Sequence, residues 1–227
     1  MLHMNDQDDI ANGMASLSAK VFDFVFELPP VMIDLRSWLS QMICDEDPIL
    51  GYSLKEHFAQ WEASSDINKV NVGGFVSGVC CTEALCTPRS VERVLSKLRS
   101  IAVANMKCDN FPVNSSYGMA AFGSMLVVKD NCPDLLDFVY DDLPRLLEGF
   151  DTSSTDFGMI STKVDVIKPI DNLRQAIGGL PKANSKIVFD MLKILRLDQH
   201  VAPDIFNIRE FIDGLTYAKI VCAKAFV

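Results

Sequence analysis

The chain has 227 residues, of which 49% are hydrophobic, and it carries a formal net charge of −9. This composition is typical of a globular protein with a sizeable core, and the length suits one domain. The negative charge argues against non-specific binding to nucleic acid or to an acidic membrane surface.

Seven cysteines are spread irregularly along the chain. Their odd number and uneven spacing argue against a disulfide framework, and we expect reduced thiols in a cytoplasmic protein. The first residues contain no basic stretch followed by an apolar one, so no secretory signal is predicted. Charged residues or prolines interrupt every apolar run well before the roughly 18 residues that would indicate a membrane span.

The polar, acidic residues 1–16 are predicted to form a flexible lead-in to a single domain over residues 17–227. Apolar residues at intervals of three and four predict helices over residues 17–28 and 32–43. Residues 66–78 are rich in asparagine and glycine, and we expect them to form a loop.

Two capping patterns mark further helix starts. Ser53 and Glu56 form the pattern of a capping box, while Thr87 and Pro88 are a typical N-cap and first-turn pair. No alternation of apolar and polar residues indicates a strand, so we expect an all-α domain of about nine helices. The later helices are expected over residues 119–128, from Pro133 onward, and over residues 171–177, 184–197 and 208–226.

Three sequence blocks, taken in order, resemble those of RhoGAP domains. The first is Val72–Gly78, ahead of the Thr87 helix; the second is Leu135–Leu147, which closes on a Leu-Pro pair. The third is Leu180–Asn184, which leads into an amphipathic helix and a final apolar helix. The resemblance implies a single RhoGAP-like helical domain over residues 17–227.

The resemblance also implies that the groove for a GTPase lies between the first block, the second-block helix and the last helix. Active members of the family insert an arginine there, and such a finger is worth about 10³ to 10⁵ in rate. The matching position here is Val76, which offers neither a charge nor a hydrogen-bond donor. The implied partner-binding residues are Gly74, Phe75, Val76, Ser77, Asp137, Asp141 and Gly214.

The family's other polar positions are also changed. Asp137 falls where the family has a lysine, Asp141 where it has an arginine, and Gly214 near its asparagine. We therefore expect no catalytic residue and no GTPase-activating activity. The expected function is a non-catalytic interaction domain of a larger protein, which binds a small GTPase or an adaptor with a basic surface. Nucleic acid and integral membrane association are not expected.

Two alternatives to this interpretation stay open. In the first, Arg89 or Arg93 acts as a displaced finger and the domain is an active GTPase-activating protein. In the second, the three blocks match by chance and the chain is an unrelated helical scaffold that oligomerises. The aspartates Asp137 and Asp141, with Asp142, also fit an ordinary solvated helix face.

Metal and nucleophile chemistry have little support in the sequence, and no cofactor is expected. Cys80, Cys81 and Cys86 are close in sequence, but adjacent cysteines rarely bind one tetrahedral ion and no histidine lies nearby to complete the set. A cysteine nucleophile needs a histidine brought near by the fold. The candidates are His3, His57 and His200.

Overall fold

The computed structural model describes residues 34–58, 65–82, 84–104, 115–150, 163–197 and 204–224. The chain divides into two units, Met1–Ile33 and Asp34–Val227, and every described residue belongs to the second. The lead-in predicted over residues 1–16 and the helix predicted over residues 17–28 lie outside the described residues.

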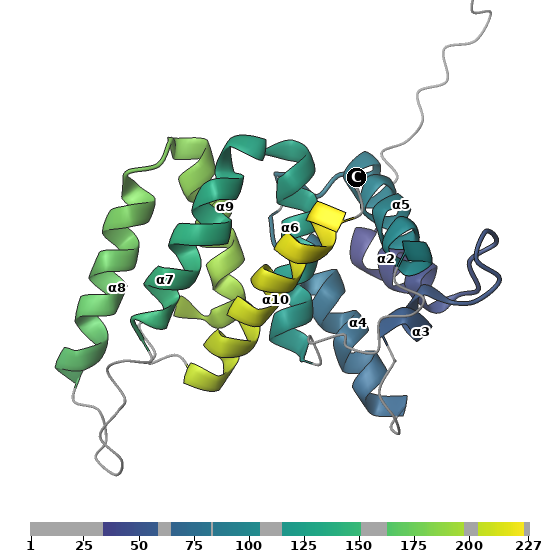
Figure 1. Ribbon diagram of the computed structural model, residues 1–227, viewed down its shortest axis with the longest axis horizontal. Helices are drawn as coiled ribbons and strands as arrows, with labels where there is room; N and C mark the ends of the chain where they lie inside the picture. The colour runs from purple at the N-terminus through teal and green to yellow at the C-terminus, as the bar shows by residue number, and fades with distance from the viewer. Residues whose placement is uncertain are drawn as a thin grey trace, which may run out of the picture. The chain divides into compact units, whose positions relative to one another are not determined.

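Within the described residues the fold is all-α, as predicted, with nine α-helices and no strand (Figure 1). An isolated bridge joins Glu46 and Ser53. No helix in this part of the chain is both long and apolar enough to cross a bilayer. The α-helices are α2 (Leu35–Cys44), α3 (Leu54–Phe58), α4 (Ser65–Val79), α5 (Pro88–Ala104), α6 (Ser116–Asn131), α7 (Leu143–Glu148), α8 (Lys163–Gly178), α9 (Lys182–Leu192) and α10 (Ile205–Lys224).

Both capping patterns mark a helix start in the structure. The Thr87 hydroxyl accepts a hydrogen bond from the backbone N–H of Ser90 at 3.2 Å, and α5 begins at Pro88. Glu56 lies one turn after Ser53, with 3.3 Å between the Glu56 carboxylate and the Ser53 hydroxyl. The Thr87 hydroxyl thus satisfies a backbone N–H that has no partner within the helix, whereas the contact at Ser53 joins two side chains.

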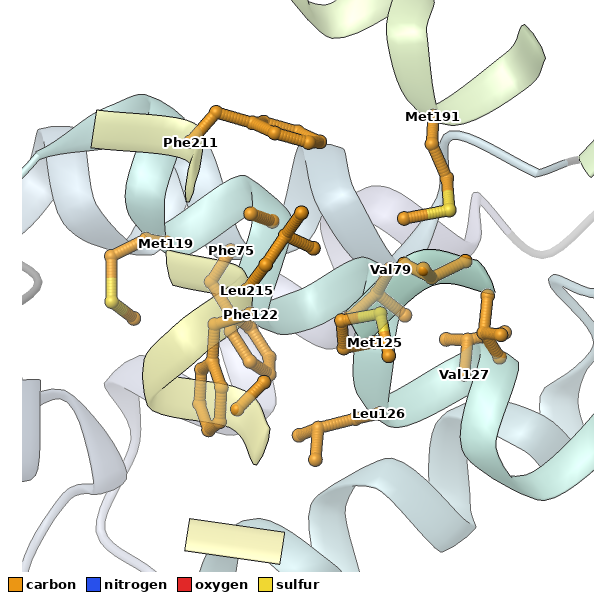
Figure 2. Packing of buried hydrophobic residues seen from close by; sticks show 14 of the residues in the cluster. Phe75, Val79, Met119, Phe122, Met125, Leu126, Val127, Met191, Phe211 and Leu215 are labelled. Atoms are coloured by element: carbon orange, nitrogen blue, oxygen red, sulfur yellow. The ribbon is translucent and has the colours of Figure 1, made fainter. Parts of the chain in front are cut away.

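Helix α6 is the centre of the core. Every residue from Gly118 to Val128 is buried, because the helix is apolar all round and α4 and α10 pack against it. Aromatic rings connect these three helices: the ring centroids of Phe75 and Phe122 (both labelled in Figure 2) are 5.8 Å apart, and those of Phe122 and Tyr217 are 5.3 Å apart.

The predicted loop over residues 66–78 is wrong, because this stretch lies inside helix α4. Glycine is a poor helix former, which is why the sequence favoured a loop. In the fold, Gly74 and Gly78 bring α4 close to α6. A Cβ on Gly74 would overlap the backbone of Ser116, and one on Gly78 the backbone of Ala120. Burial of the apolar side chains of α4 offsets the low helix propensity.

Two other predicted helices differ in detail. The segment from Pro133 begins with a 3₁₀ turn, η1 (Pro133–Leu135), and continues through a π-helical turn, η2 (Phe138–Asp142), into α7. Helix α8 is longer than the predicted 171–177, since it continues through Pro169 from Lys163. Helix α9 is followed by a 3₁₀ turn, η4 (Lys193–Leu195).

Candidate functional site

The first-block residues do not form a protruding loop in this structure. Phe75 is fully buried in the core and Val76 is 7% exposed. Gly74 is in close contact with α6, and only Ser77 of the four predicted binding residues in this block is exposed. An arginine finger has to reach the nucleotide of a partner, and the position of Val76 on a buried helix face does not offer that reach.

Gly214 on α10 is part of a helix junction rather than of an open surface. A Cβ at this position would overlap the backbone of Gly118 on α6. The glycine therefore allows α10 to approach the central helix closely. The structure thus gives Gly74 and Gly214 a shared role in packing, each on a helix that contacts α6.

The second-block aspartates lie at the surface. Asp137, Asp141 and Asp142 are all exposed on or beside η2. Asp141 accepts a hydrogen bond from the Lys219 ammonium of α10 at 2.6 Å, and both side chains are 50% exposed. Lys219 also lies 5.8 Å from the centroid of the Tyr140 ring. These contacts place Lys219 beside the exposed aspartates.

An apolar hollow opens between helices α8 and α9, and none of the predicted binding residues lines it. Its volume is about 270 Å³, and apolar atoms form most of its wall. The side chain of Phe189 is 43% exposed beside it. The lining residues are Ile170, Leu173, Arg174, Phe189, Leu192, Lys193 and Leu197.

The turn between α8 and α9 fixes the two walls of this apolar hollow. The Ser185 hydroxyl donates hydrogen bonds to the carbonyl oxygens of Ile177 at 2.7 Å and Leu180 at 3.1 Å. These bonds join the start of α9 to the end of α8. On the wall, Leu173 and Leu192 are buried, whereas Arg174 and Lys193 are exposed at the rim, where Lys193 donates a hydrogen bond to Asp190.

A second, polar hollow of about 470 Å³ lies where α2, the end of α4 and α9 meet. Three cationic side chains line it, from Arg36, Lys186 and Lys193, together with Ser77, Cys80, Cys81, Asp190 and Ile194. Asp190 is buried and accepts a hydrogen bond from Lys193 at 2.6 Å. A concentration of positive charge is notable in a chain whose net charge is −9.

Three cysteines cluster beside this polar hollow. The sulfur atoms of Cys80 and Cys86 are 3.4 Å apart, and Cys81 lies 3.4 Å from the Ser124 hydroxyl. Burial raises the pKa of the Cys81 thiol to about 11. The sequence placed these cysteines together, but only the turn between α4 and α5 brings Cys80 and Cys86 into contact.

Of the remaining predicted candidates, the structure describes the two arginines. Arg89 and Arg93 are exposed on the first turns of α5. His3, His200 and the side chain of His57 lie outside the described part of the structure. Among the described residues, no group of three histidine, cysteine, aspartate or glutamate side chains is arranged to hold a metal ion.

Comparison with protein-family models, with curated proteins and with solved structures finds no match for this chain.

Proposed function

We propose that this chain is a non-catalytic protein-interaction domain, and the observation that carries the proposal is the apolar hollow between α8 and α9. Apolar surface that opens to water marks sites where partners bind, since covering it is favourable. A hollow between two helices with an aromatic side chain at its edge suits an apolar anchor from an amphipathic partner helix.

The wall of the apolar hollow defines the chemistry of this partner. The lining is mostly apolar, and of the two cationic side chains at its rim, Arg174 and Lys193, the second already pairs with Asp190, so we expect a leucine or phenylalanine anchor from the binding segment. The anchor would supply most of the affinity.

The experiment compares proteins retained from cell lysate by the immobilised chain and by Phe189→Ser, followed by titration of each purified candidate. The Kd for direct binding should rise at least tenfold in Phe189→Ser, which corresponds to a loss of about 1.4 kcal/mol of binding free energy. Phe206→Ser on α10 is the matched control, because Phe206 is 64% exposed and is not part of the hollow. A partner that binds both variants as tightly as the unchanged chain would contradict the proposal.

The acidic face at η2 favours a second candidate, in which the partner is a small GTPase or an adaptor with a basic surface. Asp137, Asp141 and Asp142 are exposed, and the RhoGAP resemblance suggests this class of partner. Purified Rho, Rac and Cdc42, each loaded with GDP or a GTP analogue, are the probes. The double change Asp137→Lys/Asp141→Lys should abolish binding, and binding that persists in this variant would rule out the acidic face.

We further propose that the domain does not accelerate GTP hydrolysis. The burial of Val76 within α4 supports this, because the residue in the finger position cannot reach a partner in this conformation. Hydrolysis by Rho, Rac, Cdc42, Rab and Arf proteins should stay within about tenfold of the intrinsic rate, a difference of about 1.4 kcal/mol. Greater acceleration that is lost in Arg89→Ala or Arg93→Ala would establish the displaced-finger alternative.

A further inference from the structure

The turn between α4 and α5 holds two thiols in contact. Cys80 follows the last residue of α4, and Cys86 lies two residues before Pro88, the first residue of α5. The backbone N–H groups of Leu85 and Cys86 both donate to the carbonyl oxygen of Thr82, at 3.0 and 2.9 Å. This turn folds the segment back, which leaves the two sulfur atoms 3.4 Å apart.

We propose that Cys80 and Cys86 form an oxidisable dithiol pair, in which a hydroperoxide converts the two neighbouring thiols into a disulfide that joins the end of α4 to the segment before α5. A disulfide bond is about 2.05 Å long, so the sulfur atoms have to approach by little more than an ångström. Both residues flank a turn rather than lying within one rigid helix, which makes this movement feasible.

Cys86 is the thiol that reacts first. In the neutral pair, the Cys86 thiol donates a hydrogen bond to the Cys80 sulfur. When Cys86 ionises, the proton that remains on Cys80 can be donated to the thiolate. This hydrogen bond, together with the positive charge of Arg36 on α2, lowers the pKa of Cys86, while the same pairing and burial raise the pKa of Cys80. The thiolate is the nucleophilic form of cysteine.

Accessibility favours the same order of reaction. Cys86 is partly exposed, whereas Cys80 is 7% exposed. The polar hollow, which Cys80 lines and Cys86 does not, carries the cations Arg36 and Lys186, and its one carboxylate, Asp190, pairs with Lys193. Cys81 also lines the hollow, but its raised pKa keeps it protonated near neutral pH.

The reaction balances with hydrogen peroxide as the oxidant. The Cys86 thiolate attacks one peroxide oxygen, the O–O bond breaks, and the products are a Cys86 sulfenic acid and hydroxide, which takes up a proton. The Cys80 sulfur then attacks the Cys86 sulfur as it loses its proton. The S–S bond forms, the S–O bond breaks, and the departing hydroxide leaves as water. Two electrons pass from the sulfur pair to the peroxide, and a dithiol reductant reverses the change.

The experiment treats the full chain with hydrogen peroxide, blocks free thiols with iodoacetamide, and digests the product with trypsin and a protease that cleaves after glutamate. The bond after Glu83 is then cut, so Cys80 and Cys86 fall on separate peptides unless a disulfide joins them. We expect this linked pair, with the loss of two hydrogen atoms, to form about tenfold faster than Cys44 is oxidised. Cys44 is the reference because it is exposed and belongs to no thiol pair.

Variants separate the roles of the three thiols. In Cys80→Ser, the sulfenic acid on Cys86 should persist and be trapped by dimedone, while Cys81→Ser should form the bridge as the unchanged chain does. Replacing Arg36 with methionine should slow Cys86 alkylation at neutral pH. Peroxide treatment that oxidises Cys44 or Cys132 without linking Cys80 and Cys86 would overturn the proposal, as would a bridge that requires Cys81.

Discussion

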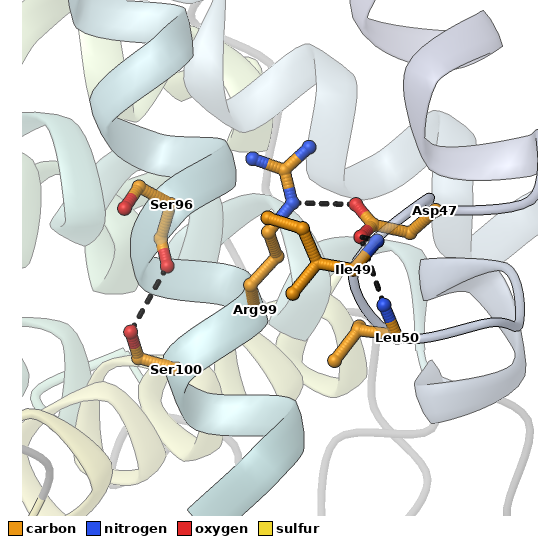
Figure 3. A network of polar contacts seen from close by, with 6 residues as sticks. All are labelled: Asp47, Ile49, Leu50, Ser96, Arg99 and Ser100. Carbon is orange, nitrogen blue, oxygen red and sulfur yellow. Dashed lines mark hydrogen bonds and ion pairs between the residues drawn. The ribbon is translucent and has the colours of Figure 1, made fainter.

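At the scale of single residues, the ion pair of Asp47 and Arg99 joins the turn after α2 to helix α5 (Figure 3). Asp47 is buried in the turn after α2 and accepts a hydrogen bond from Nε of Arg99 on α5 at 2.5 Å. The backbone N–H groups of Ile49 and Leu50 donate to its other oxygen at 3.0 and 3.2 Å. One carboxylate thus fixes the turn and connects it to a distant helix.

Removing this charge should destabilise the fold. Asp47→Asn leaves the Arg99 guanidinium without its carboxylate, and hydrogen bonds to charged groups contribute about 2 kcal/mol. We expect the free energy of unfolding in urea at pH 7 to fall by roughly that amount. The control is Asp141→Asn, because exposed ion pairs contribute about 1 kcal/mol or less. If the free energy of unfolding falls equally in the two variants, burial of Asp47 does not strengthen its contact with Arg99.

The pH dependence of this contact has a definite sign. Burial by itself would raise the pKa of Asp47, but the hydrogen bonds from Arg99, Ile49 and Leu50 hold the pKa below its ordinary value. A lowered folded pKa stabilises the protein above the unfolded pKa of about 3.9, and this contribution is lost as pH falls through the folded pKa. The difference between the unchanged chain and Asp47→Asn should be constant from pH 7 to 5 and shrink below about pH 4. A difference that grows with acidity would contradict this sign.

At the scale of elements, the contact between α4 and α6 depends on the absence of side chains. Gly78 faces the Ala120 backbone, and Gly123 of α6 faces the Phe75 carbonyl oxygen, so the two helix backbones approach at both points. Gly73 of α4, by contrast, is exposed. Apart from its own helix backbone, no atom lies within 4 Å of the place where its Cβ would be. Two glycines on one helix therefore have opposite environments.

These environments predict opposite effects of the same substitution. Gly78→Ala forces α4 away from α6 and should destabilise the protein by about 2 to 3 kcal/mol. Gly73→Ala should stabilise it by about 0.5 to 1 kcal/mol, because alanine is the better helix former. Thermal unfolding of the two variants measures the contrast. If both stabilise the protein to a similar extent, the close approach of α4 and α6 is absent.

At the scale of the whole described unit, the buried helix α6 organises the fold. Helices α4, α5 and α10 all contact it, and its residues from Gly118 to Val128 are buried. An element surrounded in this way opens only when most of its neighbours separate. The free energy needed to open α6 should therefore equal the free energy of global unfolding.

Hydrogen exchange tests this order of stability. The amides of Gly118–Val128 should exchange most slowly, and their exchange should depend on urea as steeply as global unfolding does. Helix α3, of five residues, should exchange earlier. The measurement is exchange followed by mass spectrometry at several urea concentrations. Exchange of α6 that is as fast as that of α3 would contradict a central role for the buried helix.

The helical class and several helix boundaries follow from local patterns in the sequence. Apolar periodicity and the caps at Ser53 and Thr87 are local signals, because they depend on side chains within one turn of each other. The same signals predicted α6 and α10 close to their observed positions. No comparable local signal connects α8 to α9 across the apolar hollow, so this candidate site could not be predicted from sequence.

The environments of the glycines and the thiols depend on contacts between segments that are distant along the chain. The glycine-rich stretch of α4 reads locally as a loop, yet packing against α6 makes it a buried helix and removes Phe75 and Val76 from the surface. Cys80 and Cys86 are six positions apart in the sequence, and the turn at Thr82 brings their sulfurs into contact. Helix propensity acts over a few residues, whereas burial depends on segments that are distant along the chain, and the free energy of burial determined the outcome.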